Sequence, residues 1–138
     1  MVATATEQVL SITDLEKLNI IKYFKTINQA EFDQTAALFI ESGKLLAPFE
    51  KPLVGREAIA SYLAQEAREM KLFPETGTIA AINDSEQQIN LTGKVKTALF
   101  TVNIGWYFTV NSVGQIITAK IKLLASPQEL LGLKKLKD

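Results

Sequence analysis

The chain has 138 residues, a formal net charge of zero and an apolar fraction of 47%. This length predicts one domain with a sizeable core, and the composition argues against disorder. The balanced charge gives no indication of nucleic-acid binding. Because the chain contains no cysteine, disulfides and thiolate nucleophiles are excluded. The absence of histidine removes the commonest general base and metal ligand, so acid–base chemistry would depend on Asp, Glu, Lys or Tyr.

The N-terminus lacks the basic start and apolar core of a signal peptide, and no apolar run approaches the roughly 18 residues that cross a bilayer. We therefore expect a soluble, cytoplasmic protein. No repeat, low-complexity tract or linker divides the chain. We expect a flexible arm over residues 1–12, a single domain over 13–133 and a tail over 134–138.

The first predicted element is a helix that begins at the capping-box sequence Thr13–Glu16 and ends near Asn28. Its apolar stripe includes Tyr23, which should therefore face inward. An inward tyrosine is most often a core aromatic whose hydroxyl bonds a backbone carbonyl. The alternative is a phenolic donor in a cavity.

Two more helices are predicted, Glu31–Ile40 and Glu57–Lys71. Gly43 should end the first of these, with a brief strand at Lys44–Ala47 after it. Glu66 lies at the edge of the inward face of the third helix, where a lone carboxylate is most often solvated or salt-bridged. That inward face comprises Ile59, Leu63, Ala67 and Met70.

Strands follow, beginning with a predicted strand at Thr78–Ile82. The next segment alternates apolar and polar residues, which is the period of a strand with one dry face. The tetrapeptide Asn111–Gly114 suits a tight hairpin turn, and Ser126 with Pro127 favours the start of a last short helix. The three strands predicted from Gln87 onward are Gln87–Thr97, Asn103–Asn111 and Gln115–Ala125.

This order of helices and strands predicts an α+β fold, in which helices pack on one face of a curved antiparallel sheet. Such a cone encloses a cavity between helices and sheet. Between Gln87 and Ala125 there is no Asp or Glu, and Trp106 is the only tryptophan of the chain. Several apolar side chains are expected to line the cavity: Phe39, Phe49, Phe73, Phe100, Phe108, Met70 and Leu72.

These residues favour binding over catalysis. Tyr23 and Trp106 would supply two neutral donors in an apolar cavity, which suits one acceptor atom on a greasy ligand, such as a ketone oxygen. On composition alone, the more usual role for Trp106 is that of a core residue bonded to a backbone carbonyl. The alternative functions are a small-molecule isomerase or hydrolase on the same fold, and a protein-interaction module that uses the leucine-rich segment Gln128–Leu136.

Several segments resemble the C-terminal domain of cyanobacterial orange carotenoid proteins. The resemblance runs from about Lys22 to Leu133 and is strongest in four segments: Ala47–Glu57, Lys71–Glu75, Leu91–Thr97 and Leu123–Leu131. Because the helical N-terminal domain of those proteins is absent, the chain resembles the free-standing homologues of the C-terminal domain. The resemblance implies a nuclear transport factor 2-like cone and no enzymatic activity.

The resemblance also implies a ligand and its contacts. The ligand is a ketocarotenoid of the echinenone or canthaxanthin type, whose ring carbonyl would accept hydrogen bonds from Tyr23 and Trp106. Met70, Leu72, Phe73 and Ile121 match apolar tunnel positions, and Glu66 matches a glutamate that pairs with an arginine of the missing domain.

The implied partners are a second copy that shares one pigment, a helical carotenoid-binding protein and, transiently, a membrane; thylakoids are the expected neighbourhood. The implied roles are photoprotective: carotenoid transfer and singlet-oxygen quenching. Three features differ from the family pattern, one of which is that Ala67 replaces a residue that is sometimes cysteine. Ala98-Leu99 replaces a Pro-Trp pair, and the connection from Leu99 to Trp106 is shorter.

Overall fold

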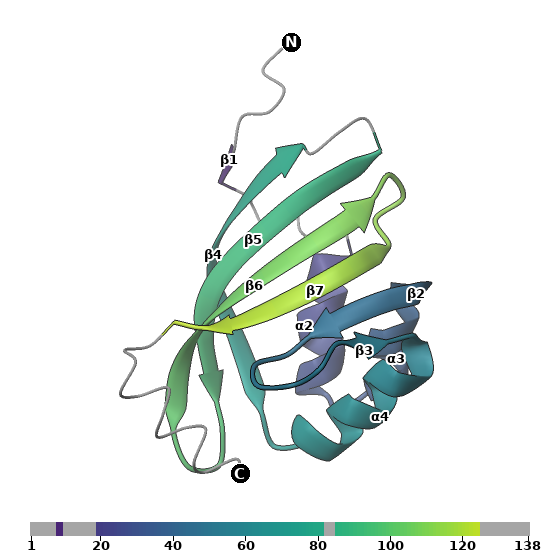
Figure 1. The fold of residues 1–138 in the computed structure, drawn as a ribbon. Helices are drawn as coiled ribbons and strands as arrows, with labels where there is room; N and C mark the ends of the chain where they lie inside the picture. Colours follow the sequence, from purple (N-terminus) through teal and green to yellow (C-terminus); the bar gives the residue numbers. More distant parts are fainter. Residues whose placement is uncertain (1–7, 10–18, 82–84, 125–138) are drawn as a thin grey trace.

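The computed structural model describes residues 8–9, 19–81 and 85–124 of the chain. These residues form one curved seven-stranded sheet of order β1-β4-β5-β6-β7-β2-β3, with three helices together on one side of it (Figure 1). The α+β cone with helices on one face of a curved sheet is therefore confirmed. The predicted capping box and the predicted last helix lie outside the described residues.

Helix α2 spans Ile20–Asn28 and lays its apolar stripe against the sheet. Asn19, directly before it, adopts a left-handed conformation with φ of 64°. Because that conformation cannot continue a right-handed helix, the predicted uninterrupted helix from Thr13 to Asn28 is wrong in its start and right in its end. The stripe is confirmed, since Ile20, Tyr23, Phe24 and Ile27 are all buried.

Helix α3 is shorter than predicted, spanning Phe32–Ala37, and strand β2 follows at once over Phe39–Leu46. The predicted helix to Ile40 is wrong because Phe39 pairs with Ile116 of a distant strand. The brief strand predicted at Lys44–Ala47 is the second half of β2. Strand β3, Leu53–Val54, folds back on β2 as an edge strand.

Helix α4 spans Arg56–Glu66, and strand β4 spans Lys71–Ala81. The helix predicted to reach Lys71 therefore ends early, and the strand predicted from Thr78 begins at Lys71. The cause is again tertiary, since β4 pairs along its length with the next strand. Pro74 is tolerated at a register shift in β4, where the short β1, Gln8–Val9, does not reach.

The three-strand meander is confirmed to within a few residues. It consists of β5 over Glu86–Lys96, β6 over Thr101–Asn111 and β7 over Ile116–Leu123. Asn111–Gly114 makes the predicted turn, in which the Gly114 N–H donates to the Asn111 carbonyl at 3.0 Å. Strand β7 also pairs with β2, and that pairing is parallel. The sheet is therefore mixed, whereas the sequence predicted an antiparallel one.

The two ends of the sheet differ in how closely they are packed. Near the β6–β7 turn, the inward side chains are fully buried: Phe39, Phe108, Val110 and Ile116 meet Ile20 from α2. Near the β5–β6 turn, several inward side chains are only half-buried, including Val102, Ile121 and Leu123. We call these the closed end and the open end of the cone.

Candidate functional site

A cavity of about 390 Å³ occupies the open end, between the helices and the inner face of the sheet. Residues of α2, α4, β2, β4, β5, β6 and β7 line it, together with the β5–β6 turn, and nearly all of them are apolar. Its volume falls in the range of small-molecule sites. The lining residues are Tyr23, Ile27, Leu45, Ala47, Pro48, Phe49, Tyr62, Leu63, Glu66, Ala67, Met70, Leu72, Val95, Thr97, Ala98, Leu99, Phe100, Val102, Ile104, Trp106, Ile121 and Leu123.

Tyr23 places a hydroxyl in this apolar surrounding. Its ring stacks edge-on against Phe108, with ring centroids 4.9 Å apart, and it is fully buried. Of the buried side-chain polar atoms in the described part of the chain, the Tyr23 hydroxyl is the one without a hydrogen-bond partner. The core interpretation, in which this hydroxyl bonds a backbone carbonyl, is therefore wrong. A buried polar group left unpaired costs free energy that a ligand acceptor would recover.

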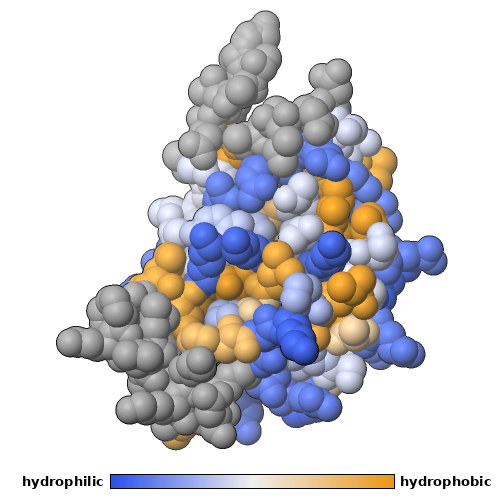
Figure 2. Space-filling model, viewed as in Figure 1, coloured by the Kyte–Doolittle hydropathy of each residue, from blue (hydrophilic) through white to orange (hydrophobic). Residues whose placement is uncertain are grey.

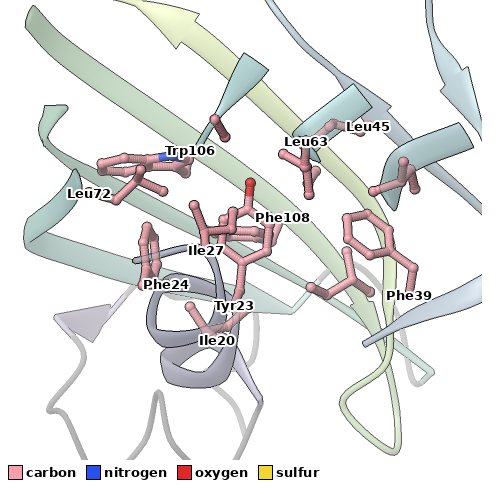
Figure 3. Close-up of a cluster of buried hydrophobic side chains, with 14 of the residues drawn as sticks. Ile20, Tyr23, Phe24, Ile27, Phe39, Leu45, Leu63, Leu72, Trp106 and Phe108 are labelled. Atoms are coloured by element: carbon pink, nitrogen blue, oxygen red, sulfur yellow. The ribbon is translucent and has the colours of Figure 1, made fainter. Parts of the chain in front are cut away.

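The electrostatic state of this phenol is fixed by its surroundings. Burial raises the pKa of Tyr23 above its ordinary value, and the neighbouring Tyr62 raises it further. Tyr23 therefore stays protonated and acts as a neutral donor. Figure 3 shows its oxygen directed away from α2, toward the space between Trp106 and Leu63.

Trp106 comes from β6, on the other wall of the same space (Figure 3). It is 1% exposed and packs edge-on against Phe24, with ring centroids 4.9 Å apart. Because its strand neighbours Leu91 and Ile121 face inward as well, the indole is held from both sides. The structure thus brings together at one cavity the two donors that the sequence analysis singled out.

Three of the four predicted tunnel residues, Met70, Leu72 and Ile121, line the cavity, but Phe73 does not. Phe73 is 50% exposed on the outer face of the sheet. The reason is the strand period: Leu72 points inward, so its neighbour in β4 must point outward. The sequence pattern instead predicts a helix that ends near Lys71.

The other four phenylalanines expected at the cavity divide into two groups. Phe49 and Phe100 line it, whereas Phe39 and Phe108 lie in the packed core. Leu45 and Tyr62 are lining residues that the sequence analysis did not find. Tyr62 lies one helical turn before Glu66, and this spacing could have predicted that both reach the cavity. Because α4 is only weakly amphipathic, its sequence does not show clearly which side faces inward.

Acidic groups are scarce at this site. Glu66 is its one carboxylate among the described residues, and its side chain is exposed at the cavity edge. Within that same part of the chain, no group of three or more His, Cys, Asp or Glu residues could hold a metal ion. The helices described there are all too short or too polar to cross a membrane. The arrangement supports hydrogen bonding to one acceptor in an apolar pocket, rather than acid–base chemistry.

No protein-family model matches the chain. The orange carotenoid-binding protein of Synechocystis sp. is 37% identical over 133 residues, which are 94% of this chain and 42% of that protein. The protein of the same description from Limnospira maxima is 37% identical over 128 residues, 90% of this chain and 40% of that protein. The chain thus spans about two fifths of the length of the curated relatives it matches.

Solved structures that resemble this chain include a protein of the same description. The Anabaena (Nostoc) orange carotenoid protein binding canthaxanthin superposes with a TM-score of 0.74 at 37% identity, covering 83% of this chain and 38% of that one. A ketosteroid isomerase-like protein from Erwinia carotovora atroseptica reaches 0.66 at 14% identity, covering 84% of this chain and all of that one. At that identity the likeness concerns the fold alone.

The fold of the chain is nuclear transport factor 2-like, since proteins of that description from Novosphingobium aromaticivorans and Cytophaga hutchinsonii superpose with TM-scores of 0.66 and 0.63 at 14% and 12% identity. Within that class, the chain is a homologue of the C-terminal domain of the orange carotenoid proteins. The resemblance drawn from the sequence is confirmed over this domain.

Proposed function

We propose that this chain binds a ketocarotenoid and carries it, with the keto-bearing ring held in the open-end cavity. The observation that supports this most directly is the buried, unpartnered hydroxyl of Tyr23 in a cavity that Trp106 also lines. A ring carbonyl is an acceptor without a proton, so two neutral donors complement it. Apolar burial at ~25 cal/mol per Å² would supply most of the affinity.

The residues present fit one end of such a pigment. The cavity wall is apolar except for a few hydroxyls and the edge carboxylate of Glu66. A domain of this size has a radius of gyration of about 14 Å, and a carotenoid is nearly as long as such a globule is wide. One domain therefore covers part of the pigment, which favours a homodimer sharing one molecule.

The proposal includes handing the pigment to or from helical carotenoid-binding proteins or membranes, and quenching singlet oxygen through the bound polyene. An enzyme on this fold is the alternative, and the chemistry of the site disfavours it. The raised pKa of Tyr23 leaves it protonated, so it cannot act as a base at neutral pH. Glu66 lies exposed at the rim, apart from the buried end of the cavity.

The test is an absorption spectrum of the protein purified from a ketocarotenoid-producing host. We expect a coloured wild type, and a blue-shifted visible band in both Tyr23→Phe and Trp106→Phe, because each removes a donor that polarises the conjugated ketone. Each single variant should still take up pigment, since one hydrogen bond contributes about 0.5–1.5 kcal/mol; the double variant should bind more loosely.

Tyr107→Phe is the matched control. Tyr107 follows Trp106 in β6 but points to the outer face, where Lys122 lies over its ring. Its loss should leave the spectrum unchanged. A colourless wild type would overturn the function, whereas wild-type spectra in both donor variants would overturn the carbonyl assignment.

A further inference from the structure

Apolar side chains are exposed around the mouth of the cavity. Leu99, at the tip of the β5–β6 turn, is 78% exposed, and Phe49 beside the opening is 46% exposed. Phe73 is 50% exposed on the outer face. Figure 2 shows apolar surface interspersed with hydrophilic side chains on one face of the molecule. Single exposed apolar residues are ordinary, but Leu99 and Phe49 at the rim of one apolar cavity, with Phe73 on the outer face, indicate a contact surface.

Lysines lie near Phe73 on the outer face of the sheet. The strand register places Lys71 directly opposite Lys96, and Phe73 opposite Lys94. Lys122 lies on the same outer face in β7, because its partner Gly105 is paired with the outward Thr92. All four lysines are exposed. We call Lys71, Lys94, Lys96 and Lys122, with Phe73 and Leu99, the basic rim.

Little negative charge offsets the basic rim. From Gln87 to Leu124 the chain has no Asp or Glu. Glu75 is 3.4 Å from Lys94, an exposed ion pair of small stabilising effect. Lys71 and Lys96 lie directly opposite each other across two strands, and the Lys71 ammonium donates a hydrogen bond to the Asn28 carbonyl at 2.7 Å. The outer face of β5 and β7 beside the cavity mouth is therefore basic, while Glu66 is the carboxylate at the cavity edge among the described residues.

The tip that carries Leu99 is built rigidly. The Thr97 hydroxyl accepts hydrogen bonds from the N–H groups of Leu99 and Phe100, at 3.2 and 3.0 Å. It also donates to the Phe100 carbonyl at 2.9 Å. The turn thus holds the Leu99 side chain exposed to water. Because the turn is already ordered, binding of a partner would not cost the conformational entropy that a flexible loop loses.

We propose that the basic rim docks the protein on an anionic lipid bilayer, with Leu99 and Phe73 in the interface and the lysines on the headgroup phosphates. Exposed apolar side chains flanked by lysines are the composition of interfacial membrane-binding surfaces. The same edge carries the cavity mouth, so an apolar pigment could pass between bilayer and cavity without crossing water. This inference rests on the proposed function for its purpose, but not for its test.

The test uses pigment-free protein and pigment-free vesicles. Co-sedimentation is measured with phosphatidylglycerol–phosphatidylcholine vesicles and with phosphatidylcholine vesicles, at low and high salt. We expect binding to the anionic vesicles only, and its loss at high salt because screening shortens the reach of the lysines. No binding to anionic vesicles, or binding equal on both lipids and insensitive to salt, would overturn the proposal.

Two matched sets of variants, one of lysines and one of apolar residues, locate the surface. Lys96→Gln and Lys122→Gln should each reduce partitioning roughly fivefold, whereas Lys22→Gln and Lys25→Gln, on the exposed face of α2, should not. Leu99→Ser should weaken binding, whereas Val113→Ser should not, although Val113 is 71% exposed at the other hairpin tip. Equal effects of the rim and control variants, in either the lysine set or the apolar set, would overturn the assignment to the basic rim.

The outcomes separate this inference from the proposed function. A protein that takes up pigment with the expected spectra but ignores anionic vesicles refutes the membrane surface alone. A protein that binds vesicles through the basic rim but never takes up ketocarotenoid refutes the carrier function alone. If the lysine variants instead slow pigment transfer to a helical acceptor protein without vesicles present, the rim recognises an acidic protein, and the bilayer is excluded.

Discussion

The closed and open ends of the cone are made by the same three strands, yet they differ in packing. At the closed end, Phe108, Val110 and Ile116 are fully buried against α2 and β2. At the open end, Val102, Ile121 and Leu123 face an unfilled cavity. The strand pattern is alike at both ends, so the difference lies in what covers it. One sheet thus separates the residues that stabilise the fold from those available to a ligand.

Truncating one isoleucine at each end of β7 tests this separation most strongly. Ile116→Ala should cost about 2–5 kcal/mol of unfolding free energy, because it leaves a hole in a closed core. Ile121→Ala should cost about 1 kcal/mol, because it enlarges a cavity that already exists. Denaturant titration of the pigment-free protein measures both. Equal losses would show that the open end is packed as tightly as the closed one.

Replacing either of two glycines near the open end by alanine should lower stability, but by different amounts. A Cβ at Gly93 would overlap the Phe73 carbonyl oxygen and lie 2.8 Å from the Pro74 Cα, both of which are backbone atoms. Gly93→Ala should therefore cost about 1–3 kcal/mol. At Gly105 the obstacle is the Tyr107 side chain, 2.5 Å away, which can rotate. Gly105→Ala should cost less, and thermal denaturation of the two variants compares them.

Removing the side-chain hydrogen bonds of the two hairpin turns should lower stability by a smaller amount, but the two turns should differ in pigment uptake. Asn111 accepts hydrogen bonds from the N–H groups of Val113 and Gln115, at 3.1 and 2.9 Å, much as Thr97 does in the β5–β6 turn. Asn111→Ala and Thr97→Ala should each cost about 1 kcal/mol. Only Thr97→Ala should also weaken pigment uptake, because its turn lines the cavity. Equal uptake by both variants would contradict a functional difference between the ends.

Tyr23→Phe should have the smallest effect on the pigment-free protein. Because the hydroxyl is buried without a partner, its removal should leave stability unchanged or raise it by up to about 1 kcal/mol. A loss of stability on denaturant titration would reveal a partner for this hydroxyl.

The pH dependence of the same variant has a definite sign. Burial raises the pKa of Tyr23 in the folded protein above its ordinary value of 10.0. Below about pH 10, Tyr23 is protonated in both states and contributes no pH dependence. Above it, the unfolded phenol ionises while the folded one does not, so stability falls as pH rises. Tyr23→Phe should show a shallower fall in alkaline denaturation; identical slopes would contradict the raised pKa.

Local pattern was sufficient for the meander and for the inward face of α2. The alternation in β5 and the Asn111–Gly114 turn are set by residues close in sequence, and both were predicted. The pairing of Tyr23 with Trp106 at one cavity was also accessible, because each lies on an inward face of its own element. The resemblance then joined two residues that no local pattern could connect.

Long-range pairing explains the errors. Phe39 and Lys71 were assigned to helices because the flanking segments are helical, but both are strand residues held by distant partners, Ile116 and Lys96. The wrong element at Lys71 led directly to the wrong face for Phe73. The basic rim could not be predicted from the sequence for a similar reason, since only the strand register brings Lys71 beside Lys96.

The parallel pairing of β2 with β7 has a consequence for the order in which the protein forms. During vectorial synthesis, β2 leaves the ribosome long before β7, and until then its Leu45 and Leu46 lack their partners Ala119 and Lys120. Closing so long a loop is slow, because its entropy is lost before the contact is gained. Leu45 and Ala47 border the cavity from the early side, and Ile121 and Leu123 from the late side. The nascent chain therefore cannot hold a ligand until almost the whole domain has been translated.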